Sequence, residues 1–265
     1  MLIKLRIASC FLLLSTFLLG GCVTLDYPTD PGDPFESFNR GMHNFNESLD
    51  EYVLKPVATG YDTMTPSNVQ KGVNNFFSNL DDVLVIFHDL FQLKLGQFVS
   101  DTGRLLINST LGLYGVFDWA SDMGLEKHEE DLGQTLGYWG VPRGPYLVLP
   151  FFGPSTVRDA GGLYVDSQEI NLVYNEIHEG MPFPSRDTTV SNTLTVVDAI
   201  STRARLLKAG NILEEASLDK YIFLREAYLQ RRNYLVFDGE PPMEDWEYYE
   251  DDKPINSRAN ESESD

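Results

Sequence analysis

Apolar residues recur along most of the chain at steps of three and four, which is the spacing of one face of an α-helix. The clearest stripe is Phe35, Phe38, Met42, Phe45 and Leu49. Asp33 suits the N-cap position before it, Pro34 suits the first helical position, and Glu36 completes a capping-box pattern. The pattern therefore predicts an amphipathic helix that Lys55-Pro56 ends or bends.

The same reading predicts further helices and no transmembrane β-barrel, because no sustained alternation of polar and apolar residues occurs. Thr65-Pro66 repeats the cap chemistry, and Asp81-Asp82 before the apolar run 83–99 indicates another helix start. The later predicted helices are one capped by Ser155 that runs towards Gly161-Gly162, one capped by Ser185 or Asp187 that Gly210 stops, and one from Ser217 to about Phe237. We therefore expect an all-α fold with a single domain at 34–239.

Residues 132–153 differ from the rest, because Gly and Pro recur too often for one long helix. The segment also holds aromatic residues of the kind that gather at membrane interfaces, including Tyr138, Trp139, Phe151 and Phe152. Two interpretations stay open. The segment is either an extended loop packed over a core or an apolar hairpin that dips into a bilayer.

The N-terminus has the three parts of an export signal: basic Lys4 and Arg6, an apolar stretch at 7–19, and Leu19-Gly20-Gly21-Cys22. About 13 apolar residues fall short of the roughly 20 that a spanning helix needs. We therefore predict a signal peptide at 1–21, lipidation of Cys22, and a polar tether at 22–33. Because Val23, and not Asp, follows the cysteine, we expect the outer membrane as the destination.

The net charge of the chain excludes some classes of binding partner. The chain carries 40 acidic and 20 basic residues, a net charge of −20, and loss of residues 1–21 with Lys4 and Arg6 would leave −22. Such a chain repels nucleic acid and anionic surfaces. The segment 240–265 is strongly acidic and is predicted to be a disordered tail. Cys10 leaves with the signal peptide, so no free thiol remains for catalysis or metal binding.

The sequence holds no recognised catalytic or metal motif. Its four histidines form no HExxH pair, and no nucleophile elbow, phosphate loop or dinucleotide fingerprint occurs. The run Lys127–Asp131 is predicted to be a solvated loop, not a metal site. Arg158-Asp159 is the one suggestive polar cluster, with a local ion pair and a helix stop as the alternative. We expect no enzyme activity, no cofactor and no metal.

Five segments resemble the MlaA (VacJ) outer-membrane lipoproteins, and the resemblance runs from about Asp33 to Asp238. They read DPFESFNRGMHNFNESLDEYVLKPVA, FFSNLDD, GRLLINSTLGLYGVFDWA, LGQTLGYWGVPRGPYLVLPFFGPSTVRDAGG and REAYLQRRNY. The resemblance implies a ring-like, membrane-embedded helical domain in the periplasmic leaflet of the outer membrane, with an amphipathic channel. It also implies retrograde phospholipid transport, association with trimeric porins, and delivery to a soluble periplasmic carrier, MlaC.

Within this resemblance, the stretch from Tyr138 to Gly162 is expected at or beside the channel. The candidate channel or head-group contacts are Arg143, Tyr146, Arg158 and Asp159. The candidate channel-control residues are Asn39, Arg40, Asn44, Phe45 and Asn46, with plain helix capping and packing as the alternative. Two other functions stay open: a structural adaptor that scaffolds porins, and, less favoured, a lipid-acting enzyme.

Overall fold

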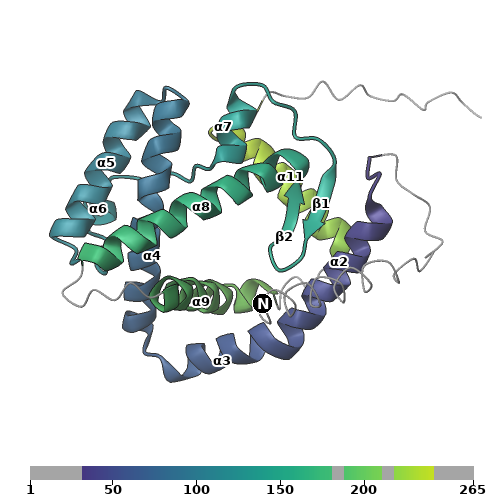
Figure 1. Ribbon diagram of the computed structural model, residues 1–265, viewed down its shortest axis with the longest axis horizontal. Coiled ribbons are helices and arrows are strands. Elements are labelled where there is room, and N and C mark those ends of the chain that lie inside the picture. The colour runs from purple at the N-terminus through teal and green to yellow at the C-terminus, as the bar shows by residue number, and fades with distance from the viewer. Residues whose placement is uncertain (1–31, 181–187, 211–217, 242–265) are drawn as a thin grey trace, which may run out of the picture.

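The computed structural model describes residues 32–180, 188–210 and 218–241 (Figure 1). The helices are α2 (Glu36–Leu49), the π-helical turn η1 (Asp50–Leu54), α3 (Lys55–Met64), α4 (Ser67–Phe91), α5 (Leu95–Thr110), α6 (Trp119–Asp122), α7 (Leu132–Tyr138), α8 (Val157–Gly180), α9 (Thr188–Arg205) and α11 (Lys220–Val236). Strands β1 (Tyr146–Leu149) and β2 (Gly153–Thr156) form an antiparallel hairpin, with Tyr146 opposite Thr156. The prediction of a helical fold is confirmed.

Several predictions lie outside the described residues. These are the signal peptide at 1–21, lipidated Cys22 with most of the 22–33 tether, the caps at Ser185, Asp187 and Ser217, and the tail from 242 onwards. The helices that those caps precede, α9 and α11, are described and occupy the expected stretches.

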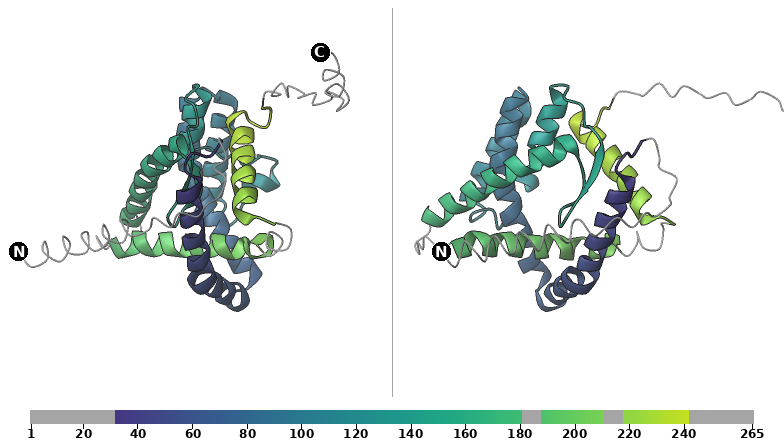
Figure 2. Two further views of the ribbon diagram at one scale, coloured as in Figure 1. Left: turned by 90° about the vertical axis from the view of Figure 1, so that its right-hand side faces the viewer. Right: turned by 45° about the vertical axis from the view of Figure 1, so that its right-hand side comes forward.

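The helices make a circuit in space (Figure 1). In this view α2 and α3 run down one side and along the bottom, α4 and α5 form the opposite side, and α8 and the hairpin lie between α7 at the top and α9. Helix α9 crosses the middle in both Figure 1 and the right-hand view of Figure 2. Helix α11 lies beside α2, and Arg225 of α11 contacts Asp33 just before α2. Residues distant in the sequence therefore meet around α9.

Helix α2 has the predicted stripe, but its three phenylalanines are exposed, while Met42 packs against the small core of the hairpin and α11. Phe38 is 51% exposed and Phe45 is 44% exposed, whereas Asn39 on the other face is 0% exposed. The predicted side-chain cap is also wrong, because Phe35 occupies the N-cap position with no side-chain bond. The carboxylate of Asp33 instead accepts from Asn39 Nδ2 at 3.0 Å and from the Tyr221 hydroxyl. Asp33 thus ties α2 to α11.

The chain bends where Lys55-Pro56 predicted a bend or an end. The π-helical turn η1 joins α2 to α3 without a break, and Pro56 lies in the first turn of α3. Proline has no N–H to donate to the preceding turn, and a wider turn accommodates that missing bond.

Two predicted boundaries around α4 are wrong. Helix α4 runs unbroken from Ser67 to Phe91, so Asp81-Asp82 is helix interior and not a helix start. Thr65 precedes α4 at the expected place, but no side chain caps the helix. The long apolar stretch is instead broken after Phe91, where Leu93 adopts φ 60 before α5 begins.

Helix α8 corrects a third boundary. Ser155 lies in β2, and the helix passes through Gly161-Gly162 to Gly180. A Cβ placed on Gly162 would lie 2.6 Å from the backbone nitrogen of Gly133 in α7. Gly162 therefore serves a close helix crossing, and it does not stop the helix.

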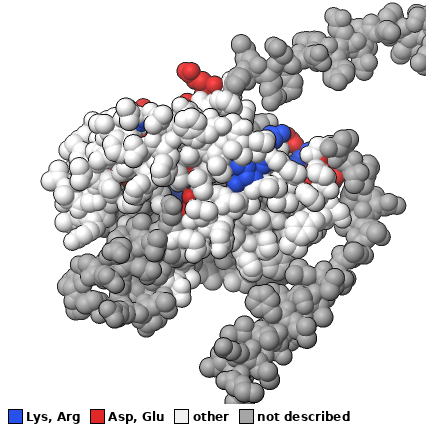
Figure 3. Space-filling view, turned by 45° about the horizontal axis from the view of Figure 1, so that its top comes forward, with Lys and Arg blue, Asp and Glu red and all other residues white. Residues whose placement is uncertain are grey.

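The described molecule is polar inside and apolar outside. Its buried polar and charged side chains outnumber its buried hydrophobic ones, and large apolar side chains are exposed on nearly every element. Figure 3 shows one face that is mostly uncharged, with charged groups confined to small areas. No described helix is both long and apolar enough to cross a bilayer. Large exposed apolar surfaces mark contact with a membrane or with another protein.

Candidate functional site

A polar cavity of about 550 Å³ lies among α4, the segment 127–134, α8, α9 and α11. Helix α4 lines it with a stripe at steps of three and four, and α9 lines it with a second stripe. The α4 stripe is Asn74, Ser78, Asp81, Leu84, Val85 and His88, and the α9 stripe is Asp198, Thr202 and Arg205. The cavity therefore carries charge in the middle of a molecule whose outside is apolar.

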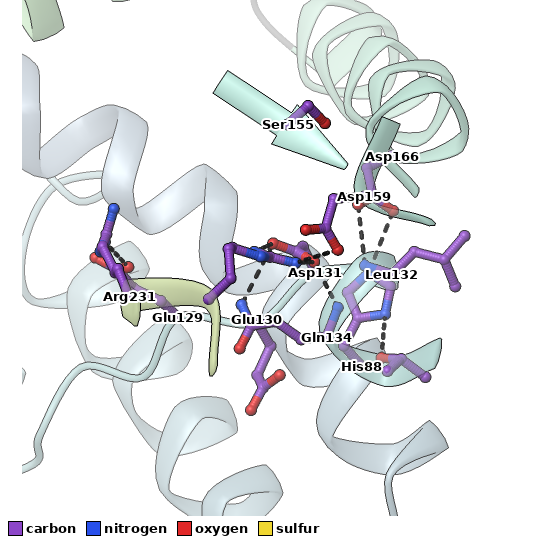
Figure 4. A network of polar contacts seen from close by, with 12 residues as sticks. His88, Glu129, Glu130, Asp131, Leu132, Gln134, Ser155, Asp159, Asp166 and Arg231 are labelled. Atoms are coloured by element: carbon purple, nitrogen blue, oxygen red, sulfur yellow. Dashed lines mark hydrogen bonds and ion pairs between the residues drawn. The ribbon is translucent and has the colours of Figure 1, made fainter. Parts of the chain in front are cut away.

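Arg232 of α11 organises one wall of this cavity. Its guanidinium donates to both oxygens of Asp131, at 2.5 and 2.9 Å, and to Asp159 Oδ1 at 3.1 Å. The Tyr228 hydroxyl donates to the other oxygen of Asp159 at 3.0 Å. Burial alone would raise the pKa of Asp131 and of Asp159, but the neighbouring guanidinium lowers both below their usual range. This wall is a closed ion-pair cluster (Figure 4).

A chain of hydrogen bonds continues the wall from α4 to α8. Gln92 Nε2 donates to Thr135 Oγ1 at 3.1 Å, and Thr135 lies 3.1 Å from His88 Nδ1. His88 Nε2 lies 3.4 Å from Asp166, whose other oxygen accepts from the Leu132 N–H at 3.0 Å. Thr135 Oγ1 can accept from Gln92 and donate to His88 Nδ1, whereas within the described residues His88 Nε2 and Asp166 Oδ1 form no hydrogen bond. Figure 4 shows His88 and Asp166 on this wall.

Gln134 at the start of α7 leaves an acceptor on the cavity. Its side chain is 2% exposed and lines the cavity. Its amide nitrogen donates to Asp131 Oδ2 at 3.3 Å, which sets the amide orientation. Within the described residues, Oε1 then has no hydrogen-bond partner. A buried acceptor without a partner costs free energy unless a ligand or water supplies a donor.

Three charged side chains of the cavity stand apart from the closed cluster. Within the described residues, Asp81 on α4 and Asp198 and Arg205 on α9 form no ion pair. Burial raises the pKa of Asp81 to about 7, Lys127 opposes this and Asp198 adds to it. Burial also raises the pKa of Asp198, and Arg205 opposes that shift. The three groups are therefore within electrostatic range of one another while remaining open to the cavity.

The hairpin beside the cavity is held by two asparagines of α2. Asn39 Nδ2 donates to the Tyr146 carbonyl at 3.0 Å, and its Oδ1 accepts from the Val148 N–H at 2.8 Å. Asn46 repeats this pattern with the Leu149 carbonyl and the Phe151 N–H, at 2.9 and 2.8 Å. Seven helical residues and three strand residues each span about 10 Å. The two asparagines therefore match the strand repeat, and each side-chain amide completes the open edge of β1.

Comparison with known proteins identifies the fold. A family model described as MlaA lipoprotein matches residues 31–235. The chain belongs to the MlaA lipoprotein family. It is 35% identical over 244 residues to the "Intermembrane phospholipid transport system lipoprotein MlaA" of Escherichia coli (strain K12), covering 89% of this chain and 91% of that protein.

Two further likenesses agree with the MlaA assignment. The Haemophilus influenzae protein of the same name is 32% identical over 234 residues, covering 86% of this chain and 89% of that protein. A solved structure described as "Structural basis for maintenance of bacterial outer membrane lipid asymmetry" matches with a TM-score of 0.65 and 35% identity. It covers 77% of this chain and 98% of that one.

The MlaA fold brings three of the predicted head-group residues together. Arg143, Arg158 and Asp159 line a smaller cavity of about 330 Å³, which Arg232 also lines. Arg158 pairs with Asp159 at 2.9 Å, and its backbone N–H donates to the Arg143 carbonyl at 3.1 Å. Tyr146 is 3% exposed and packs with Tyr221 in a small core. Tyr146 therefore lies apart from this cavity.

The predicted channel-control residues differ in their surroundings. Arg40 pairs with Glu36 at 2.8 Å and Asp219 at 3.0 Å, and stacks over Tyr221. Phe45 meets Phe151 of the hairpin edge-on at 5.5 Å, whereas Asn44 is exposed. With the two bonding asparagines, four of the five therefore make contacts that position α2, the hairpin or α11.

Sequence reasoning missed the polar cavity and misread one of its segments. Lys127–Asp131 is only partly solvated: Lys127 pairs with Asp82 and Glu130 is 8% exposed, whereas Glu129 is exposed. The one available signal for the cavity was spacing, since Asp81 and His88 lie seven residues apart on α4, as do Asp198 and Arg205 on α9. That spacing places each pair on one helix face, but it does not reveal that the two faces meet.

Proposed function

We propose that this protein is a lipid-anchored outer-membrane lipoprotein that removes phospholipid from the outer leaflet and passes it to the periplasm, so that membrane lipid asymmetry is maintained. The proposal follows its relatives, which are named for intermembrane phospholipid transport. Transport moves an unchanged lipid, so this role asks for a path and for no bond-breaking chemistry.

The observation that carries the proposal is the inverted distribution of polarity. A phospholipid needs a polar path for its head group inside a body that is compatible with hydrocarbon. The cavity among α4, α8, α9 and α11 offers charged and amide groups, while Leu106, Val99 and Tyr114 are more than half exposed on the outside. A water-soluble protein would hide such side chains. A ring of helices embedded in one leaflet accounts for both features.

A neighbouring cavity supports a path for the tails. It measures about 510 Å³ between α2, the hairpin, α9 and the start of α11. Apolar groups such as Leu206, Phe223 and Leu224 line it, although charged groups lie at its edge. Because α9 borders this cavity and the polar one, a lipid lying across α9 would find surroundings for its head and for its tails.

The anchor and the partners complete the proposal. Two or more acyl chains at Cys22 would hold the protein stably at the periplasmic face of the membrane. Because a passive path needs a sink, we propose a soluble periplasmic carrier of the MlaC type that binds the lipid more tightly. We also propose a trimeric porin as the membrane partner, to which the exposed apolar surface is suited.

The test begins with a strain that lacks the gene. Phosphatidylethanolamine on the cell surface is measured with an impermeant amine-reactive label, and the strain is complemented with wild-type protein or Cys22→Ala. We expect surface label to rise on deletion, to fall to the parental level with wild-type protein, and to stay high with Cys22→Ala at matched protein levels. Unchanged label on deletion would contradict the transport role. Full rescue by Cys22→Ala would contradict the lipid anchor alone.

A further inference from the structure

Among the described side chains that line the polar cavity, more acidic than basic groups are left without an ion pair. Most of its cations are already engaged, since Lys127 pairs with Asp82, Arg231 with Glu129, and Arg232 with the closed cluster. Of the charged side chains that line the cavity, Asp81, Asp198 and Arg205 form no ion pair with any described residue. The open part of the wall therefore offers two carboxylates and a single guanidinium.

A second observation also indicates a ligand with N–H donors. Gln134 is 2% exposed and lines the same cavity, and its Oε1 has no hydrogen-bond partner in the described part of the chain. The Oδ1 atom of Asp166, on the same wall, likewise lacks a hydrogen bond there and is only 3.4 Å from His88. Buried acceptors of this kind are satisfied by a donor that enters the cavity. An ammonium group supplies three N–H donors and a positive charge.

Asp198 and Arg205 lie seven residues apart, which places them on one face of α9, about two turns from each other. Asp81 lines the same cavity from α4, and the charges of Asp198 and Arg205 both affect its pKa. An anionic site and a cationic site thus lie along one wall, about two turns of α9 apart. This arrangement is complementary to a zwitterion, in which a phosphate and an ammonium are joined by a short linker.

We propose that the cavity selects zwitterionic amino-phospholipids, with the ammonium of an ethanolamine head group against Asp81 and Asp198 and the phosphate against Arg205. The inference rests on the proposed function and specifies its substrate. A head group that ends in glycerol hydroxyls carries no positive charge for the two carboxylates, so an anionic phospholipid binds less tightly. A charge-assisted hydrogen bond is stronger than a neutral one, which sets the direction of the preference.

The test uses the full-length lipidated protein, purified in detergent and exposed to mixed micelles with equal amounts of phosphatidylethanolamine and phosphatidylglycerol of identical acyl chains. Lipid retained after removal of excess micelles is quantified by mass spectrometry. We expect the wild type to retain phosphatidylethanolamine over phosphatidylglycerol by about tenfold, equivalent to about 1.4 kcal/mol. In Asp81→Asn/Asp198→Asn the ratio should fall to near one while retained phosphatidylglycerol stays within about twofold.

Two further variants give matched controls. Glu126→Gln removes an exposed carboxylate outside the cavity and should keep the wild-type ratio. Arg205→Gln should lower the retention of both lipids, because both carry the phosphate. Equal retention of the two lipids by the wild type, or an unchanged preference in the double variant, would overturn the inference and leave the transport role standing. Retention of neither lipid would contradict both.

Discussion

Two groups of aspartates in and beside the polar cavity have pKa values shifted in opposite directions. Asp131 and Asp159 share the guanidinium of Arg232, which lowers the pKa of each. Asp81, on the facing side, forms no ion pair with any described residue, and its pKa is raised to about 7. The ion pairs of Asp131 and Asp159 with Arg232 hold α7, α8 and α11 together. The second group costs stability when ionised, and strongly perturbed groups of that kind are typical of functional positions.

The largest expected effect concerns the closed cluster. Arg232→Leu leaves Asp131 and Asp159 without their shared cation, and removal of one partner from a buried pair costs about 3 kcal/mol or more. Urea unfolding in detergent, followed by circular dichroism, measures the loss. Arg231→Leu is the matched control, because its pair with Glu129 is exposed on both sides and is worth about 0–1 kcal/mol. Equal losses in the two variants would contradict the role given to the cluster.

The next effect concerns the asparagines that hold the hairpin. Asn39→Ala leaves the buried Tyr146 carbonyl and Val148 N–H without their side-chain partner, and we expect a loss of about 2 kcal/mol. Asn46→Ala should cost about 1 kcal/mol, because its surroundings are less buried.

Exposed Asn44→Ala provides the control and should change stability little. Hydrogen exchange adds a local readout. The amides of Val148 and Phe151 should exchange faster in the Asn39 and Asn46 variants, respectively. If Asn44→Ala destabilised the fold as much as Asn39→Ala, the docking of α2 on β1 would not be the reason.

The smallest effect has the opposite sign. Because the pKa of Asp81 is raised in the fold, its ionisation costs stability as pH rises from about 4 to about 7, and the cost is constant above that range. Asp81→Asn removes the cost. The variant should therefore melt slightly above the wild type at pH 8 and close to it at pH 4.

Asp131→Asn is the comparison for this measurement. The lowered pKa of Asp131 means that its charge stabilises the fold above about pH 4 and loses this effect as pH falls further. Asp131→Asn should therefore melt below the wild type at pH 8. A lower melting temperature for Asp81→Asn at pH 8 would show that Asp81 is a structural group like Asp131.

Periodicity predicted most helices of this fold but not their orientation. Phe38 and Phe45 of the predicted stripe are exposed, and the buried residues of α2 are the polar Glu36 and Asn39. Hydrophobic spacing identifies a face without saying whether protein or lipid covers it. The same limit applies to Gly161-Gly162, which suggests a helix stop, whereas Gly162 permits the crossing of α7 and α8.

The polar site was harder to predict because it is assembled from elements far apart in the sequence. Arg158-Asp159 was recognisable as a pair, but Arg232 and Asp131 complete the cluster from two other segments. Asp81 looked like a helix start, since a local rule explained it without any tertiary contact. The side chains that remain available to a ligand are those for which the neighbouring residues in the sequence supply no ion-pair partner.

The central claim is that lipid passes through the polar cavity, and an identical substitution at two places tests it. Leu84→Trp enlarges a side chain that lines the cavity, whereas Leu106→Trp enlarges one that is 61% exposed on the outside of α5. Both variants are introduced into the deletion strain at matched protein levels, and surface phosphatidylethanolamine is labelled. We predict that Leu106→Trp restores the parental level and Leu84→Trp does not. Full restoration by Leu84→Trp would contradict transport through this cavity.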